Sequence, residues 1–136
     1  MIVVDSSVWI DYLTGRPSRQ ADWLDIRLNR ERILVGDLIL AEVLQGCDSD
    51  RDFDATLAEM SRFSMIEIGG ELVVIEAARH YRALRARGIT VRKTIDTLIA
   101  TRCIIDDIAL LYSDRDFDPF VAHLGLRSAF DTPGAN

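Results

Sequence analysis

Short, mostly apolar runs alternate along the chain with longer segments whose apolar residues recur every three or four positions. The short runs show little polar alternation, as is typical of strands in a sheet covered on both faces. They lie at Ile2–Val4, Ile33–Val35, Met65–Ile68 and Ala109–Tyr112. The longer segments have the period of helices that bury one face. The first follows Asp5, and the others cover about residues 18–29, 38–45, 51–63, 71–86 and 94–103.

This alternation predicts an α/β fold with a mostly parallel sheet and helices on both of its faces. Asp37 stands where it can cap the helix over 38–45. Residues 116–120 are typical of a turn with a short helix, and Leu124–Leu126 of a last edge strand. Residues 131–136 contain Pro and Gly but no core residue. We therefore expect one domain over residues 1–130 and a frayed tail over 131–136.

The composition is that of an ordinary soluble domain. The chain has 136 residues, of which 49% are hydrophobic and 28% charged. No apolar run approaches the roughly 18 residues that a membrane span needs. The N-terminus lacks the basic and long apolar regions of a signal peptide, so a cytoplasmic protein is expected. Cys47 and Cys103 both lie in apolar helical patterns, which indicates two reduced thiols rather than a disulfide or a metal pair.

Charge is unevenly distributed along the chain. The net charge is −6, which taken alone argues against a surface coated for nucleic acid. Six basic residues and no acid nevertheless lie between positions 79 and 93: Arg79, Arg82, Arg85, Arg87, Arg92 and Lys93. The rest of the chain is therefore more acidic than the total indicates, and this polarity matters more than the net value.

Two carboxylates follow predicted strands. Asp5 ends the first strand and Asp114 follows the last, with Asp116 two positions further on. Ligands of open α/β sheets usually bind at the carboxyl ends of the strands. The structural alternatives are that Asp5 only caps the next helix and that Asp114 belongs to an acidic turn.

Two further acids lie inside predicted helices. Glu42 stands in Leu38–Leu44, which is otherwise apolar on nearly every face, as in a buried helix. A buried carboxylate must be paired, protonated or metal-bound, although a half-exposed helix would let Glu42 reach solvent. Asp96 lies early in the helix over 94–103, where the helix dipole alone could explain an acid.

The topology can bring these four acids together. Asp5 and Asp114 lie side by side if their strands are neighbours, and the helices of Glu42 and Asp96 can start from the same edge. Carboxylates about 5 Å apart repel by roughly 3 kcal/mol per pair at an effective dielectric near 20. A divalent cation is the natural compensation, and an all-oxygen acidic site suits Mg²⁺ or Mn²⁺.

Four segments of the chain together resemble the motifs of PIN-domain ribonucleases, and most specifically those of VapC toxins from bacterial toxin–antitoxin systems. They are Val4–Trp9, Leu40–Gly46, Asp96–Ala100 and Ser113–Phe117. The resemblance covers Met1 to about Leu126 and implies a Rossmann-like sheet. It also implies that Asp5, Glu42, Asp96 and Asp114 form an acidic quartet, with Asp5 and Asp96 as direct metal ligands and Glu42 and Asp114 acting directly or through water. Asp116 matches an additional acid, and Ser7 a small hydroxyl residue beside the metal.

The resemblance implies a Mg²⁺-dependent endoribonuclease that cleaves RNA phosphodiester bonds and thereby inhibits translation and growth. A tRNA or a ribosomal RNA is compatible as substrate. It further implies a homodimer and a VapB-type antitoxin. Apolar residues near Trp9, Tyr12, Trp23 and Leu24 are candidates for the antitoxin groove, with ordinary core packing as the alternative. The alternative functions are a PIN nuclease of RNA maturation and a non-catalytic module that binds RNA or protein.

The basic segment supplies candidate phosphate contacts: Arg79, Arg82, Arg85, Arg92 and Lys93. A solvated helix face and pairing with a partner chain are the alternatives. His80 and His123 are isolated, so no zinc site or Ser-His-Asp triad is indicated. An aspartyl phosphatase would need a second Asp where Ser7 stands, and a phosphoacceptor receiver would need an Asp where the third strand runs into Gly69-Gly70.

Overall fold

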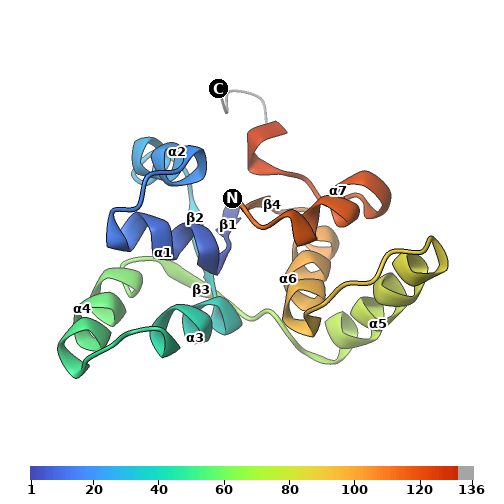
Figure 1. Ribbon diagram of the computed structural model, residues 1–136, viewed down its shortest axis with the longest axis horizontal. Coiled ribbons are helices and arrows are strands. Elements are labelled where there is room, and N and C mark those ends of the chain that lie inside the picture. Colours follow the sequence, from blue (N-terminus) through green and yellow to red (C-terminus); the bar gives the residue numbers. More distant parts are fainter. Residues whose placement is uncertain (132–136) are drawn as a thin grey trace.

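The protein is described by a computed structural model, which describes residues 1–131. Its centre is a four-stranded sheet in the order β3-β2-β1-β4, with every pairing parallel. The strands are β1 (Ile2–Val4), β2 (Ile33–Gly36), β3 (Ser64–Ile66) and β4 (Ala109–Leu111). The sheet stands between two groups of helices (Figure 1). The predicted parallel sheet with helices on both faces is thus confirmed.

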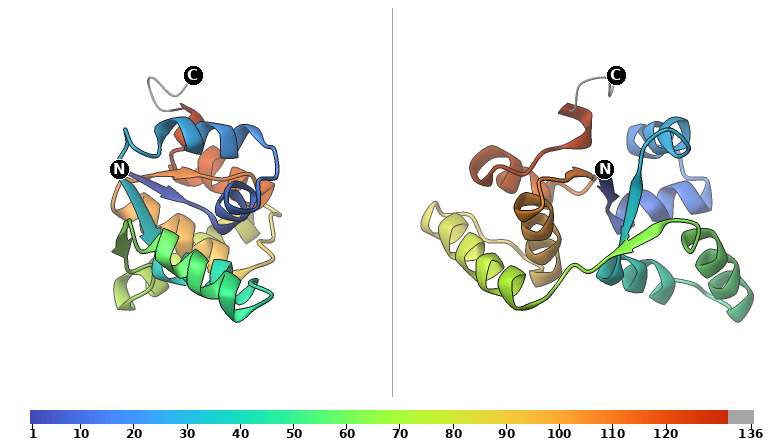
Figure 2. Two further views of the ribbon diagram at one scale, coloured as in Figure 1. Left: turned by 90° about the vertical axis from the view of Figure 1, so that its left-hand side faces the viewer. Right: turned by 180° about the vertical axis from the view of Figure 1, so that it is seen from behind.

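Within residues 1–131, seven α-helices cover the sheet. One face carries α1 (Ser6–Thr14), α2 (Arg19–Arg27), α3 (Asp37–Gln45) and α4 (Asp50–Met60). The other carries α5 (Glu71–Ala86), α6 (Thr94–Ile105) and α7 (Asp118–Leu124), and the same division is seen from behind in Figure 2. Short 3₁₀ helices, η1 (Arg115–Phe117) and η2 (Ala129–Asp131), flank α7. In the described residues, no helix is long and apolar enough to cross a membrane.

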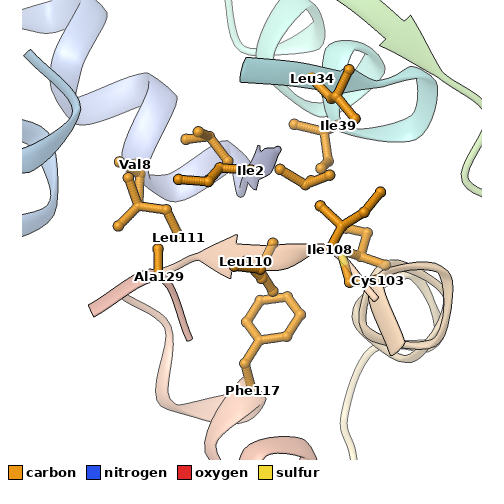
Figure 3. Close-up of a cluster of buried hydrophobic side chains, with 14 of the residues drawn as sticks. Ile2, Val8, Leu34, Ile39, Cys103, Ile108, Leu110, Leu111, Phe117 and Ala129 are labelled. Carbon is orange, nitrogen blue, oxygen red and sulfur yellow. The ribbon is translucent and has the colours of Figure 1, made fainter. Parts of the chain in front are cut away.

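The strands β1, β2 and β4 lie in the hydrophobic core. Every residue of β1, β2 and β4 is buried, which is why their sequences carry no polar alternation. Figure 3 shows Leu110 of β4 against Phe117, with Cys103 and Ile108 beside them. Because both faces are packed, the backbone that carries the residue after each strand is held rigidly.

Edge elements depart from the sequence-based expectation. The third strand ends at Ile66, not Ile68, because the amide of Ile68 donates to Asp37 Oδ1 at 2.9 Å instead of entering the sheet. Asp37 is correspondingly the first residue of α3 and not its cap, a position that Gly36 holds. The side chains of β3 are exposed or half-buried, so this edge strand lacks a strong apolar signal.

The expected edge strand at Leu124–Leu126 is wrong. Leu124 ends α7, and Gly125 follows it with a φ of 83°, the left-handed geometry that closes a helix. The only pairing of this region in the described chain is an isolated bridge between Leu110 and Ser128. Residue 131 ends η2, and the rest of the expected frayed tail, 132–136, lies outside the described residues. Cys47 and Cys103 are free thiols, the first half-buried and the second buried.

Candidate functional site

Asp5 occupies the carboxyl end of the central strand β1. Its backbone amide donates to the carbonyl of Leu111 at 2.9 Å, which fixes it against the end of β4. Its side chain is 4% exposed, caps α1 and accepts a hydrogen bond from Ser7 Oγ at 2.7 Å. Burial raises the pKa of Asp5, the Ser7 hydrogen bonds lower it, and repulsion from Asp114 raises it again. Asp5 is therefore held in place as the cap of α1, although burial and repulsion disfavour its charged form.

Three more acids converge from the neighbouring elements β4, η1 and α6. Asp114 follows β4, and its Oδ1 accepts from the amide of Asp116 at 2.9 Å as the cap of η1. Asp96 lies in the first turn of α6 and is 4% exposed. One carboxylate oxygen from each of Asp96, Asp114 and Asp116 lies within 4.8 Å of the other two. β1 and β4 are neighbours, as expected, and the charge of Asp114 acts on Asp5. The cluster of oxygens within 4.8 Å, however, is formed by Asp96, Asp114 and Asp116 and does not include Asp5.

Glu42 approaches the same cluster from α3. Glu42 is half-buried, and Ala41 and Gln45 on the same helix are exposed. The helix α3 is therefore less buried than its sequence indicates. Burial raises the pKa of Glu42, repulsion from Asp5 raises it further, and a hydrogen bond with Ser6 and the charge of Lys93 lower it. Its Oε1 is buried and has no hydrogen-bond partner among the residues that the structure describes.

Asp96 is the most perturbed of these acids. Burial and then repulsion from Asp5 raise its pKa to about 7, Lys93 lowers it, and Asp114 and Glu42 add further repulsion. The four acids of the expected quartet therefore act on one another. Asp96 Oδ2 is buried with no hydrogen-bond partner within residues 1–131. Unpartnered buried carboxylate oxygens are rare and require an explanation. A hard divalent cation with oxygen ligands fits both the unpartnered oxygens and the mutual repulsion.

The basic segment does not form one continuous strip. Lys93 Nζ lies 3.8 Å from Asp114 Oδ2, and Arg92 Nη2 lies 3.1 and 3.2 Å from the two oxygens of Asp116. Arg79 instead pairs with Glu76 on α5, while Arg82 and Arg85 are exposed on the same helix. Among the described residues of this segment, only Arg92 and Lys93 form ion pairs with acids of the site.

Two serines were not recognised as site residues from the sequence. The side chain of Ser6 forms a hydrogen bond with Glu42. Ser113 Oγ donates to Ser7 Oγ at 3.1 Å, and Ser7 Oγ in turn donates to Asp5. Ser6 carried only a capping signal, and Ser113 stood beside a more conspicuous acid. Their hydroxyls position carboxylates, a role that depends on distances between elements and not on sequence spacing.

The structure does not support the expected antitoxin groove near Trp9 and Trp23, because these side chains are buried. Trp9 and Leu24 are 0% exposed and Trp23 is 7% exposed, so they pack in the core, while Tyr12 is half-buried. An open groove of about 440 Å³ lies instead between α1, α3 and α4. Its lining combines apolar and acidic residues, including Ile10, Leu13, Val43, Ala55, Asp48, Asp52 and Glu59.

Comparison with known proteins identifies one family and several relatives. The family model of the PIN domain matches residues 2–120. Ribonuclease VapC11 of Mycobacterium tuberculosis is 29% identical over 131 residues, covering 95% of this chain and 98% of that protein. Among solved structures, VapBC2 from Rickettsia felis, bound to a promoter DNA fragment, is 18% identical with a TM-score of 0.71 and covers 94% of this chain and 97% of its own. Mycobacterium tuberculosis VapC20, described as a sarcin–ricin-loop-cleaving toxin, is 14% identical with a TM-score of 0.65 and covers 88% and 94%.

Proposed function

The chain belongs to the PIN-domain family, and on that premise we propose that it is a metal-dependent endoribonuclease and the toxin of a toxin–antitoxin pair. The observation that carries this proposal is the convergence of Asp5, Glu42 and Asp96 with Asp114, which leaves two buried carboxylate oxygens without a partner. A divalent cation would relieve the repulsion among these carboxylates. Their all-oxygen donors match those of a phosphodiester-cleaving centre. The ribonuclease name of the mycobacterial relative, which aligns over nearly the whole chain, supports the same activity.

Asp5 and Asp96 are the residues that would hold the ion directly, and Mg²⁺ or Mn²⁺ is the species that their donors favour. Glu42 and Asp114 would contribute directly or through water, with Asp116 sharing the duty of Asp114. An ion bound there lowers the pKa of coordinated water and neutralises charge on a scissile phosphate.

The chain's own side chains supply orientation and proton handling. Ser7 fixes one oxygen of Asp5, and Ser113 supports Ser7, so the Asp5 carboxylate faces the site in one geometry. Oε1 of Glu42 has no hydrogen-bond partner among the described residues, and we assign to Glu42 the orientation of the attacking water. In-line attack of water on phosphorus breaks the bond to the 3′ oxygen, which takes up a proton. The products are a 3′-hydroxyl and a 5′-phosphate.

The substrate we propose is a structured cellular RNA, either a tRNA or a ribosomal RNA. Arg92 and Lys93 lie at the site and provide phosphate contacts that carry no sequence information. The description of VapC20 as a sarcin–ricin-loop-cleaving toxin makes a ribosomal loop one candidate. Mapping new 5′ ends in cellular RNA after controlled expression would identify the cleavage site, and we place the protein in the cytoplasm with that RNA.

Cleavage of RNA by the purified protein tests the activity. We expect cleavage with Mg²⁺ or Mn²⁺, none with EDTA, and fragments whose 5′ ends can be ligated because they carry a phosphate. Binding of RNA without cleavage in either metal would favour the non-catalytic alternative. Cleavage that persists in EDTA would refute the metal-dependent mechanism.

We propose that the groove between α1, α3 and α4 receives a segment of a VapB-type antitoxin. Its lining combines apolar and acidic side chains, which suit a segment with apolar anchors and basic side chains. Ile10, which is 39% exposed in this groove, offers a test. We expect Ile10→Glu to weaken antitoxin binding at least tenfold and to leave RNA cleavage unchanged, as checked by calorimetry and a cleavage assay. Wild-type affinity in this variant would exclude the groove as the antitoxin site.

We also propose a homodimer. Three apolar side chains on the first turns of α5 are strongly exposed: Leu72 at 64%, Val74 at 45% and Ile75 at 44%. Leu72 and Ile75 are three residues apart and therefore adjoin on the helix surface. Exposed apolar residues that adjoin are typical of an interaction surface. This part of α5 is therefore the surface that we assign to the second copy of the chain.

A further inference from the structure

The two cations before α6 form ion pairs with two of the acids that would help to hold a metal. Lys93 Nζ lies 3.8 Å from Asp114 Oδ2, and Arg92 donates to both oxygens of Asp116 at 3.1 and 3.2 Å. Asp114 and Asp116 are two of the three acids whose carboxylate oxygens lie within 4.8 Å of one another. A divalent ion that enters this cluster must therefore compete with positive charges that belong to the chain.

The influence of Lys93 extends beyond its ion pair. The pKa of Asp96 is raised by burial and by repulsion from Asp5, and Lys93 opposes both effects. Lys93 likewise opposes the rise that burial and Asp5 cause in the pKa of Glu42. One ammonium group thus acts on acids contributed by three different elements: Glu42 of α3, Asp96 of α6 and Asp114 after β4.

Both cations are exposed enough to move away from Asp114 and Asp116. The side chains of Lys93 and Arg92 are 57% and 77% exposed, whereas those of Asp114 and Asp116 are 29% and 20% exposed. Lys93 is the residue before the first turn of α6, so its side chain can swing into solvent without disturbing the core. Exposed ion pairs are individually weak, so a divalent ion with several carboxylate ligands can displace them.

We propose that Lys93, assisted by Arg92, is a built-in counter-ion of the acidic site that stabilises the metal-free protein and competes with the divalent cation. This inference rests on the proposed metal-dependent function and deepens it. Lys93 is a positioning residue in the metal-free state. Metal binding frees its ammonium group beside the site, where a backbone phosphate of the substrate would arrive, so that metal and RNA binding become coupled.

Calorimetric titration of the metal-free protein with MnCl₂ tests the competition. The variants are Lys93→Met and Arg92→Met, and the matched control is Arg30→Met, which removes one exposed positive charge after α2. We expect Lys93→Met to bind Mn²⁺ about two- to fivefold more tightly than the unmodified chain, the factor that corresponds to one exposed ion pair. Arg92→Met should shift affinity in the same direction, and Arg30→Met should leave it unchanged.

Thermal unfolding in EDTA provides the second readout. Lys93→Met should lower the melting temperature more than Arg30→Met does, and Mn²⁺ should raise it by more than in the unmodified chain. Equal or weaker Mn²⁺ binding by Lys93→Met, in a chain whose unmodified form binds Mn²⁺, would overturn this inference and leave the proposed function intact. Failure of the unmodified chain and of all variants to bind Mn²⁺ would refute the metal site, and with it both proposals.

Discussion

The burial of each carboxylate at the site depends on the strand or helix that carries it. Asp5 could be singled out from the sequence because it directly follows a wholly buried strand, and Asp114 for a similar reason. Asp96 follows no strand, and only the packing of α6 explains why its side chain is 4% exposed. The unpartnered oxygens of Glu42 and Asp96 depend on atomic placement, which residue spacing does not encode.

The raised pKa of Asp96 makes the stability of the metal-free protein depend on pH. Its pKa rises from 3.8 to about 7 on folding, through burial first and repulsion from Asp5 second. The unfolded chain therefore loses this proton at lower pH than the folded chain, and stability falls as pH rises from about 4 to about 7. Above that range the penalty is complete.

Asp96→Asn should remove this penalty. In EDTA at pH 8 we expect the variant to be more stable than the unmodified chain by roughly 2 kcal/mol, with a much smaller difference near pH 4. Urea unfolding at the two pH values measures both free energies. A difference that does not grow with pH would show that Asp96 carries no raised pKa in the folded protein.

At the scale of elements, the sequence was most informative where burial was complete. β1, β2 and β4 are buried throughout, so their apolar runs predicted strands close to the observed bounds. β3 is an exposed edge strand, and its predicted bounds were late by one residue at its start and two at its end. The expected strand at Leu124–Leu126 failed because a glycine that closes α7 had been taken as part of an extended run.

The basic segment shows a further limit of sequence spacing. Its arginines are close together in sequence but separate in space, with Arg82 and Arg85 on α5 and Arg92 beside Asp116. Contacts of this kind form between a loop and an element distant in the chain. They could not be anticipated from the charge pattern, which correctly indicated only that positive charge adjoins the site.

Salt dependence can separate the contributions to RNA binding of Arg85, on α5, and Arg92, in the segment before α6. Each phosphate contact to a single strand contributes about 0.7 to the slope of log affinity against log salt concentration. We expect Arg85→Glu and Arg92→Glu each to weaken RNA binding and to reduce that slope, and Arg30→Glu to change neither. Measuring these variants in an Asp5→Asn background keeps the RNA intact. Unchanged affinity and slope in both test variants would refute the RNA-binding role of this segment.

At the scale of the whole molecule, three surfaces surround one core. The acidic site lies where the carboxyl ends of β1 and β4 meet α3 and α6, and the groove lies between α1, α3 and α4. The exposed apolar residues belong to α5, which lies on the other side of the sheet from α1 and α4 (Figures 1 and 2). This separation would let substrate, antitoxin and a second copy bind without sharing one surface.

The oligomeric state tests the assignment of α5. We expect the unmodified protein to be a dimer and Ile75→Glu to be a monomer, because a charge would be buried in the interface. Ile26→Glu on α2, where the isoleucine is 62% exposed, is the matched control and should remain dimeric. Light scattering coupled to size-exclusion chromatography distinguishes the two masses. A dimeric Ile75→Glu variant would place the interface elsewhere.

The most direct test of the central claim is the rate of Mg²⁺-dependent RNA cleavage by Asp5→Asn. The amide keeps the shape of the side chain and can still be held by Ser7, but it removes the charge of a proposed direct ligand. Loss of a group beside the direct ligands of a metal typically costs 10- to 100-fold, so we expect a loss of at least about 100-fold here. Asp54→Asn, an exposed change on α4, should keep full activity. Cleavage by a folded Asp5→Asn variant at the wild-type rate would contradict the assignment of this site.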